Sequence, residues 1–388
     1  MQLTPHKRSA VWGPQPHKCS AVWGLQPHKC SAVWGKKTKK MRKVLVIYTG
    51  GTIGMMMDPE TKSLVPFEFK DIHQQLPMLS LLDTELTFES LLPLIDSSDT
   101  NPDFWIRLAK VIGENYDHFD GFVVLHGTDT MAYTASALSF LLENLAKPVI
   151  LTGSQLPLGV IRTDGRRNIL NAIEFASAEQ DGIPLIREVC VYFQNALYRG
   201  NRTYKDDAAR FNAFYSPNYP KLADVNTFID YHKRYLFIPN SKNPLIVHDK
   251  MDNNVAVLKI FPGISEKLLE NVFQTEGLRA VIMETFGVGN APTNPAFLNV
   301  LQKAVQQGIV IVNVTQCKGG GGVVMGRYLT GKTLSDIGVI SGHDMTTEAA
   351  VTKLMYLLGT FSDVKKVKQA MEVPLRGELT IEGDVMEE

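Results

Sequence analysis

The sequence predicts an α/β protein with a larger N-terminal domain, built on a doubly wound and mostly parallel sheet, and a smaller C-terminal α/β domain. Short apolar runs rich in β-branched residues recur along the chain, and amphipathic helical patterns separate them. The chain has 388 residues, of which 44% are hydrophobic. This length exceeds the roughly 250 to 300 residues that a single core usually serves, so two packed domains are expected.

Three apolar runs in the predicted N-terminal domain, residues 41–235, indicate buried parallel strands. They are Lys43–Tyr48, Gly121–Leu125 and Pro148–Leu151, and glycine and hydroxyl residues follow each of them. A continuous apolar run is typical of a strand that is buried on both faces. Leucines at three- and four-residue spacing predict a helix over Met131–Leu145, between the last two strands.

The polar, proline-containing stretch 236–253 predicts a linker, and residues 254–388 then repeat the same pattern on a smaller scale. The predicted strands are Val255–Ile260, Arg279–Met283 and Gly308–Val314, and the predicted helices are Ser265–Phe273 and Pro295–Ala304. Strands that alternate with helices predict a second parallel sheet.

Residues 1–40 differ in character from the rest of the chain. The segment Pro5–Gly13 repeats with a period of 11 residues, and each unit is too short to bury a continuous face. We therefore predict a disordered basic tail. The alternatives are soft-metal binding by His17–Cys19 and His28–Cys30, or anionic-surface binding by Lys36–Lys43, but a metal site needs four ligands that a fold holds in place.

The charge distribution argues against a nucleic-acid partner. Residues 1–43 contain ten Lys or Arg and no acidic residue, so the remaining thirty basic residues face forty acidic ones and residues 44–388 carry a formal charge of −10. Phosphate contacts need a basic surface. No apolar run of about 18 residues and no signal-peptide pattern occurs, which predicts a cytoplasmic protein without a membrane partner. The four cysteines (Cys19, Cys30, Cys190 and Cys317) lack metal-ligand spacing, and neither a metal nor a cofactor is predicted.

The candidate catalytic residues follow the predicted strands, because ligands bind beyond the carboxyl ends of parallel strands. These positions supply Thr52, Thr128, Asp129 and Ser154, with Asp96–Asp99 after another apolar stretch. There is no Gly-x-Ser-x-Gly elbow, no metal-spaced histidine pair and no complete Walker A motif. A threonine hydroxyl remains as the candidate nucleophile, and it needs a nearby lysine or acid to activate it.

Each of these signals also has a purely structural interpretation. Gly50–Gly54 could line a phosphate, but its spacing is not Gly-x-Gly-x-x-Gly, and Thr and Gly after a strand are common turn residues. No spacing pairs His126 with a Ser or Cys, which favours a packed residue, or one that supports the catalytic groups from behind, over a catalyst. Three similar strand ends together favour catalysis over turn formation.

Several motifs carry a family resemblance. Tyr48–Met55 and His126–Met131 resemble the two signatures of bacterial-type asparaginases. Four further segments are similar to the cytoplasmic type I branch of that family: Asp96–Asp99, Thr152–Pro157, Leu197–Lys205 and Gly287–Pro292. The resemblance covers about Met41–Leu379.

The resemblance implies an L-asparaginase, an amidohydrolase of asparagine catabolism that converts L-asparagine to L-aspartate and ammonia. Thr52 would form a β-aspartyl acyl-enzyme ester, and Thr128, Asp129 and Lys205 would form a second catalytic group. The implied substrate-binding residues are Gly51, Asp96, Ser97, Ser98, Thr128, Asp129 and Ser154. The resemblance also implies a homotetramer, a dimer of dimers, because one subunit's first domain meets another's second domain at each site.

The sequence departs from the family at two places. Many asparaginases carry a tyrosine on the loop after the first signature, whereas Met55–Pro66 contains none and Leu64 stands at the aligned position. Some type I members are activated by asparagine at a second pocket, to which Thr315, Gln316 and Cys317 would correspond as candidate allosteric residues. Glu284 stands where enterobacterial relatives place an arginine of that pocket.

Three other functions compete with this one. A glutaminase-asparaginase or the asparaginase-like subunit of a tRNA amidotransferase would use the same fold, but the acidic body does not favour a tRNA partner. A non-catalytic amino-acid-binding protein would not need two hydroxyl nucleophiles and Lys205 together.

Overall fold

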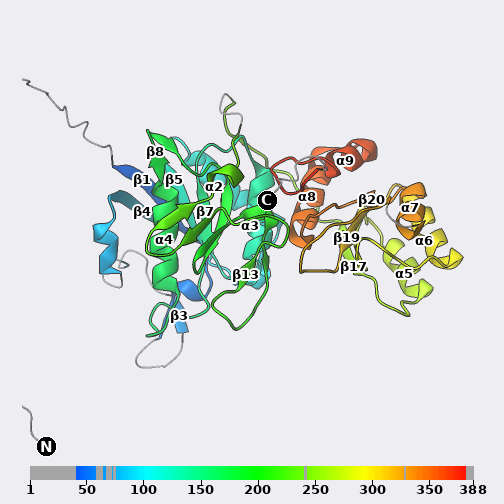
Figure 1. The fold of residues 1–388 in the computed structure, drawn as a ribbon, viewed down its shortest axis with the longest axis horizontal. Coiled ribbons are helices and arrows are strands. Elements are labelled where there is room, and N and C mark those ends of the chain that lie inside the picture. Colours follow the sequence, from blue (N-terminus) through cyan, green and yellow to red (C-terminus); the bar gives the residue numbers. More distant parts are fainter. Residues whose placement is uncertain are drawn as a thin grey trace, which may run out of the picture. The chain divides into compact units, whose positions relative to one another are not determined.

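The structure, a computed structural model, describes residues 41–57, 64–66, 72, 76–239, 243–326 and 329–381. The predicted tail at 1–40 lies outside the described residues. An eight-stranded sheet forms the N-terminal part of the described chain, with the strand order β15-β14-β11-β10-β7-β5-β1-β4. Figure 1 labels β7, β5, β1 and β4 of this sheet. In that order the strands are Ile229–Tyr231, Ala223–Val225, Ala196–Arg199, Val189–Phe193, Val149–Thr152, Gly121–Leu125, Arg42–Tyr48 and Thr84–Ser90.

The sheet is mostly parallel and is covered on both faces, as predicted. The neighbouring strands β4, β1, β5, β7 and β10 pair in parallel, and β11, β14 and β15 add an antiparallel edge. Along β1, Leu45 and Ile47 pack with helices α2 (Pro102–Glu114) and α3 (Met131–Leu141), whereas Val44 and Val46 pack with α4 (Gly165–Ser177). Side chains alternate across a strand, so an all-apolar run serves both layers.

The predicted helix Met131–Leu145 is wrong at its C-terminal end. Helix α3 ends at Leu141, and β6 (Leu142–Glu143) follows and pairs in antiparallel with β16 (Ile246–Val247). Asn144 then takes a positive φ of 62°, which no helix accepts. The leucine spacing continues past the end of the helix because the next residues are buried by the pairing of β6 with β16 and not by a further helical turn.

A second sheet of four parallel strands, β17-β18-β19-β20, forms the C-terminal part. These strands are Val255–Lys259, Ala280–Thr285, Val310–Thr315 and Ile340–Ser341, and the helices are α5 (Glu266–Phe273), α6 (Pro295–Gln306), α7 (Leu329–Asp336), α8 (Thr347–Thr360) and α9 (Val364–Met371). Helices α5 and α6 pack on one face of this sheet and α8 on the other, where the same apolar cluster continues to α3. The prediction of a smaller C-terminal α/β domain is confirmed.

The remaining elements are short. The antiparallel strand pairs are β2 (Met55–Met57) with β3 (Leu64–Pro66), β8 (Glu179–Gln180) with β9 (Ile183–Pro184), and β12 (Tyr204–Lys205) with β13 (Phe214–Tyr215). The 3-10 helices are η1 (Thr52–Gly54), η3 (Pro77–Leu81), η4 (Ser97–Asp99), η5 (Gly200–Arg202) and η6 (Lys233–Tyr235). Within the described part of the chain, no helix has the length and apolar character needed to cross a membrane.

Candidate active site

Three glycine-containing loops meet at the carboxyl ends of β1, β5 and β7. Gly51 has a φ of 86°, and a Cβ atom there would lie 2.5 Å from the Cα atom of Gly127. A Cβ atom on Gly127 would lie 2.5 Å from the hydroxyl oxygen of Ser97, and one on Gly153 would lie 3.2 Å from Cγ2 of Thr128. Because no side chain fits between these loops, their backbones approach closely. The polar residues beside the glycines are thereby brought into one site.

Thr52 begins helix η1 directly after the glycine turn, and it is half-buried. The buried ring of Tyr48, at the end of β1, lies behind this turn: a Cβ atom on Gly54 would be 2.2 Å from it. The phenol also donates a weak hydrogen bond of 3.4 Å to the carbonyl of Gly51. Burial raises the pKa of Tyr48 to about 12, so the phenol is neutral at physiological pH. Tyr48 therefore supports the turn that presents Thr52.

Thr128, Asp129 and Lys205 are in direct contact. Nζ of Lys205 lies 2.8 Å from Oγ1 of Thr128 and 2.7 Å from Oδ1 of Asp129. The lysine side chain is 16% exposed and the aspartate side chain 66%. The amine is therefore largely withdrawn from water, while the carboxylate remains accessible to a charged group of a ligand. Three of the four predicted catalytic residues thus lie together, and Thr52 is on the adjoining loop.

Gln155 completes this cluster and was given no role in the sequence analysis. The Thr128 hydroxyl donates to Oε1 of Gln155 at 3.4 Å while accepting from Lys205, so its proton and its lone pair have separate partners. The backbone N–H of Gln155 donates to both carboxylate oxygens of Asp164, at 3.0 and 3.1 Å. Gln155 directly follows Ser154, in the loop after β7, and this position in the sequence could have indicated that it belongs to the site.

The predicted substrate-binding residues lie on the loops that form this site. Oδ1 of Asp96 accepts hydrogen bonds from the backbone N–H and the hydroxyl of Ser98, and these bonds lower the pKa of Asp96. Ser97 is buried, and its carbonyl accepts from Thr130 at 2.6 Å. Ser154 is also buried, and its hydroxyl has no partner among the described residues. The loop Asp96–Asp99 is therefore held both by hydrogen bonds within it and by its bond to Thr130 on the loop after β5.

His126 is a packed residue, as predicted. It is 1% exposed, and its Nδ1 lies 2.7 Å from the carbonyl of Gly127, which can only accept, so Nδ1 carries the proton. Nε2 then accepts from the hydroxyl of Thr134, which in turn accepts from the Trp105 indole. Burial lowers the pKa of His126 to about 4. The imidazole is neutral and its polar atoms are satisfied.

This buried histidine should make the fold sensitive to acid. In the unfolded chain His126 takes up a proton near its ordinary pKa of 6.5, whereas the folded protein resists protonation down to about pH 4. The free energy of unfolding should therefore be highest above pH 6.5 and lose about 3 kcal/mol as the pH falls through that window. Urea titrations at several pH values should show this slope in the wild type and its loss in His126→Gln. A difference between the two proteins that stays constant from pH 7 to 4 would contradict this account.

The candidate allosteric residues lie at the end of β19. Thr315 and Cys317 line a pocket of about 160 Å³ with Glu284 and Tyr204, among others. The carboxylate of Glu284 accepts a hydrogen bond of 2.7 Å from Thr347. The side chain of Gln316 instead donates to the carbonyls of Ile260 and Glu284. The three residues therefore do not all face the pocket in the same way. Among the described residues, no group of three or more His, Cys, Asp or Glu side chains could hold a metal ion.

Comparison with known proteins identifies the family. The model of the asparaginase N-terminal domain matches residues 43–236, and that of the glutaminase/asparaginase C-terminal domain matches residues 254–371. L-asparaginase 1 of Escherichia coli (strain K12) is 46% identical over 346 residues, which cover 87% of this chain and 98% of that protein. The 60 kDa lysophospholipase of Mus musculus is 42% identical over 365 residues, 88% of this chain but only 63% of that protein.

Solved structures agree with this assignment. The crystal structure of L-asparaginase I from Vibrio cholerae has a TM-score of 0.79 and 42% identity, and the match covers 88% of this chain and all of that one. Fold, site and comparisons together define an enzyme that hydrolyses amide bonds. The chain belongs to the asparaginase family.

Proposed function

We propose that this protein is an L-asparaginase that acts through a threonine acyl-enzyme. The observation that carries the proposal is the contact of the Lys205 amine with both Thr128 and Asp129, beside the loop that presents Thr52. A lysine that bonds a threonine hydroxyl supplies the proton transfer that a weak hydroxyl nucleophile needs. The identity to the L-asparaginase 1 of E. coli supports asparagine as the substrate.

The reaction follows in two halves. Oγ1 of Thr52 attacks the side-chain carbonyl carbon of asparagine and loses its proton, while the leaving nitrogen gains a proton and departs as ammonia. Water then attacks the β-aspartyl ester, and the proton it loses returns to Thr52. Thr128 and Lys205 relay these protons, and backbone N–H groups of the glycine turns, including that of Gly51, stabilise the oxyanion.

The surrounding loops bind the α-ammonium and α-carboxylate groups of the substrate. Asp129, with its exposed carboxylate, binds the α-ammonium of the substrate. Ser97 and Ser98, which follow Asp96 in the sequence, donate hydrogen bonds to the α-carboxylate. The Ser98 hydroxyl must exchange its present bond to Asp96 for one to the substrate. The backbone of Ser154 meets the leaving amide.

The activity is tested by ammonia release from asparagine and glutamine over a concentration series. We expect asparagine to be hydrolysed with the higher kcat/KM. A glutamine rate equal to or above that of asparagine would place the protein with the glutaminase-asparaginases, and release from neither would refute the proposal. The shape of the asparagine curve tests whether asparagine activates the enzyme, because activation by a second bound asparagine gives a sigmoidal curve. Thr315, Gln316 and Cys317 are the candidate residues of that second site. A cytoplasmic location remains a prediction.

The predicted homotetramer, a dimer of dimers, is tested by light scattering at assay concentration. We expect a particle of four chains, because closed symmetric assembly is the common case for soluble oligomers and the family resemblance implies sites at subunit contacts. A fully active monomer would contradict both the assembly and the shared sites.

A further inference from the structure

The four predicted catalytic residues all precede the C-terminal domain, yet the segment Leu375–Thr380 at the end of that domain contacts the stretch that leads to Lys205. We propose that this segment, together with Asp344, positions Lys205 through Arg202. Arg202 is then a positioning residue for the reaction. The inference rests on the proposed function, because it requires that Lys205 handles a proton.

Three acceptors of the C-terminal part hold the guanidinium of Arg202. Nε donates to the carbonyl of Gly377 at 2.7 Å, one terminal nitrogen to the carboxylate of Asp344 at 2.7 Å, and the other to the hydroxyl of Thr380 at 3.0 Å. Asp344 also accepts from the backbone N–H of Thr380 at 2.8 Å, which closes the arrangement. Arg202 is 2% exposed. A planar guanidinium with three fixed acceptors has one orientation, which a lysine could not reproduce.

The segment that holds Arg202 is itself firmly anchored. Glu378 forms an ion pair of 2.6 Å with Lys353 of α8, and neither side chain is exposed. The Glu378 carboxylate also accepts from the backbone N–H groups of Leu375 and Arg376. Both charges are therefore paired, and they fix the loop whose Gly377 carbonyl accepts from Arg202.

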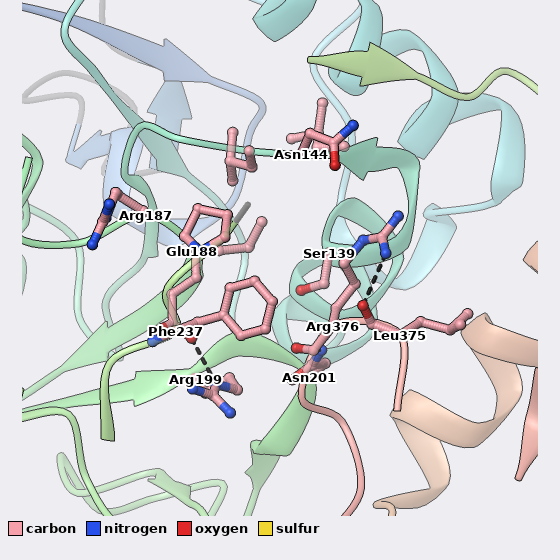
Figure 2. Close-up of a pocket in the computed structure, with 13 residues that line it drawn as sticks. Ser139, Asn144, Arg187, Glu188, Arg199, Asn201, Phe237, Leu375 and Arg376 are labelled. Carbon is pink, nitrogen blue, oxygen red and sulfur yellow. Dashed lines mark hydrogen bonds and ion pairs between the residues drawn. The ribbon is translucent and has the colours of Figure 1, made fainter. Parts of the chain in front are cut away.

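The same segment makes a second contact with the end of β11 (Figure 2). The side-chain amide of Asn201 donates to the carbonyl of Arg376 at 3.0 Å. Arg199, beside it, forms an ion pair of 2.6 Å with Glu188 and donates a longer bond of 3.3 Å to Gly377. Glu188, Arg199, Asn201 and Arg376 line a cavity of about 160 Å³ beside these contacts.

The two residues between Arg202 and Lys205 are both buried. Thr203 is fully buried and its hydroxyl donates to the carbonyl of Arg199 at 2.7 Å, and Tyr204 is 6% exposed. Lys205 itself is paired with Phe214 in the β12–β13 ladder. A displacement of Arg202 is therefore passed on to Lys205. The 2.8 Å bond between Lys205 and Thr128 would not survive a displacement of about 1 Å.

A double-variant cycle tests the inference. Arg202→Lys keeps the charge but cannot hold three acceptors in a plane, so we expect kcat to fall by roughly 10- to 100-fold with KM within about threefold of wild type. In a Lys205→Met enzyme, whose turnover is already reduced, adding Arg202→Lys should lower kcat by no more than about twofold, because the residue through which Arg202 acts is gone. A purely structural role would lower kcat by the same factor in both backgrounds.

Arg199→Lys is the matched control, since it removes another buried guanidinium from the same junction. The shorter hydrogen bonds of that guanidinium go to Glu188 and Tyr235 of the N-terminal domain. Arg199→Lys should leave kcat within about threefold, when all proteins are compared at a temperature at which they are folded. The inference would be overturned if the kcat loss of the double variant equalled the product of the two single losses. Wild-type kcat in Arg202→Lys would overturn it as well. If Arg202→Lys does not fold, Asp344→Asn takes its place in the same cycle. Full turnover by Lys205→Met alone is a different failure, which would refute the proposed role of Lys205 and the inference with it.

Discussion

Replacing Thr52 with alanine should lower the turnover of asparagine by at least about 10³-fold while the protein stays folded. The alanine cannot form the ester, and the remaining site can only bind and polarise the substrate. Thr128→Val should cause a loss of the same order, because it removes the hydroxyl that lies between Lys205 and Gln155. Initial rates of ammonia release, with circular dichroism to confirm folding, measure both effects.

Thr49→Val provides the matched control. Thr49 belongs to the same motif as Thr52 and is 2% exposed, but its hydroxyl donates to the carbonyl of Leu125 at 3.1 Å and so has a structural partner. Its loss should cost about 1 kcal/mol of stability and leave turnover within a few-fold of wild type. Near-normal turnover in Thr52→Ala, or an equal loss in Thr49→Val, would remove the special role given to Thr52.

The largest effect on stability is expected at the buried pair of Lys353 and Glu378. Burial alone would raise the pKa of Glu378, but Lys353 and the backbone N–H bonds hold it below its usual range. Glu378→Gln leaves the ammonium of Lys353 buried without a counter-charge, which should lower the free energy of unfolding by about 3 to 5 kcal/mol. Urea denaturation of the two proteins at pH 7 measures the difference.

The exposed pair of Lys43 and Glu85 provides the comparison. Their side chains are 43% and 49% exposed and lie 3.2 Å apart. Glu85→Gln should change the free energy of unfolding by no more than about 1 kcal/mol, because solvent screens such a pair. Similar losses in Glu378→Gln and Glu85→Gln would mean that the buried pair does not anchor the C-terminal segment.

Much of the fold could be predicted from the sequence, because buried parallel strands leave a clear pattern. The runs at β1, β5 and β7 were apolar without interruption, since α2 and α3 cover one face and α4 the other. The antiparallel edge of β11, β14 and β15 escaped prediction, because all three strands are short and β14 and β15 are also partly exposed. Local pattern also extended α3 too far, as the pairing of β6 with β16 depends on residues about one hundred positions apart.

The candidate site divides in the same way. Thr52, Thr128 and Ser154 could be found because each lies within four residues of the end of a strand. The contact of Lys205 with Thr128 spans 77 positions, and that of Arg202 with Asp344 spans 142, so no spacing rule indicates either of them. The burial of Lys353 and Glu378 has no local sequence signal, because charged side chains are seldom fully buried unless they are paired, and the two residues are 25 positions apart.

The central claim, a threonine acyl-enzyme at Thr52, is tested most directly by peptide mass spectrometry of protein quenched in acid during turnover of asparagine. An ester intermediate persists at low pH once the protein has unfolded, so the modified residue can be located. We expect a mass increase of one aspartyl residue on the peptide that contains Thr52. The same increase on Thr128, or on any other residue in place of Thr52, would contradict the account.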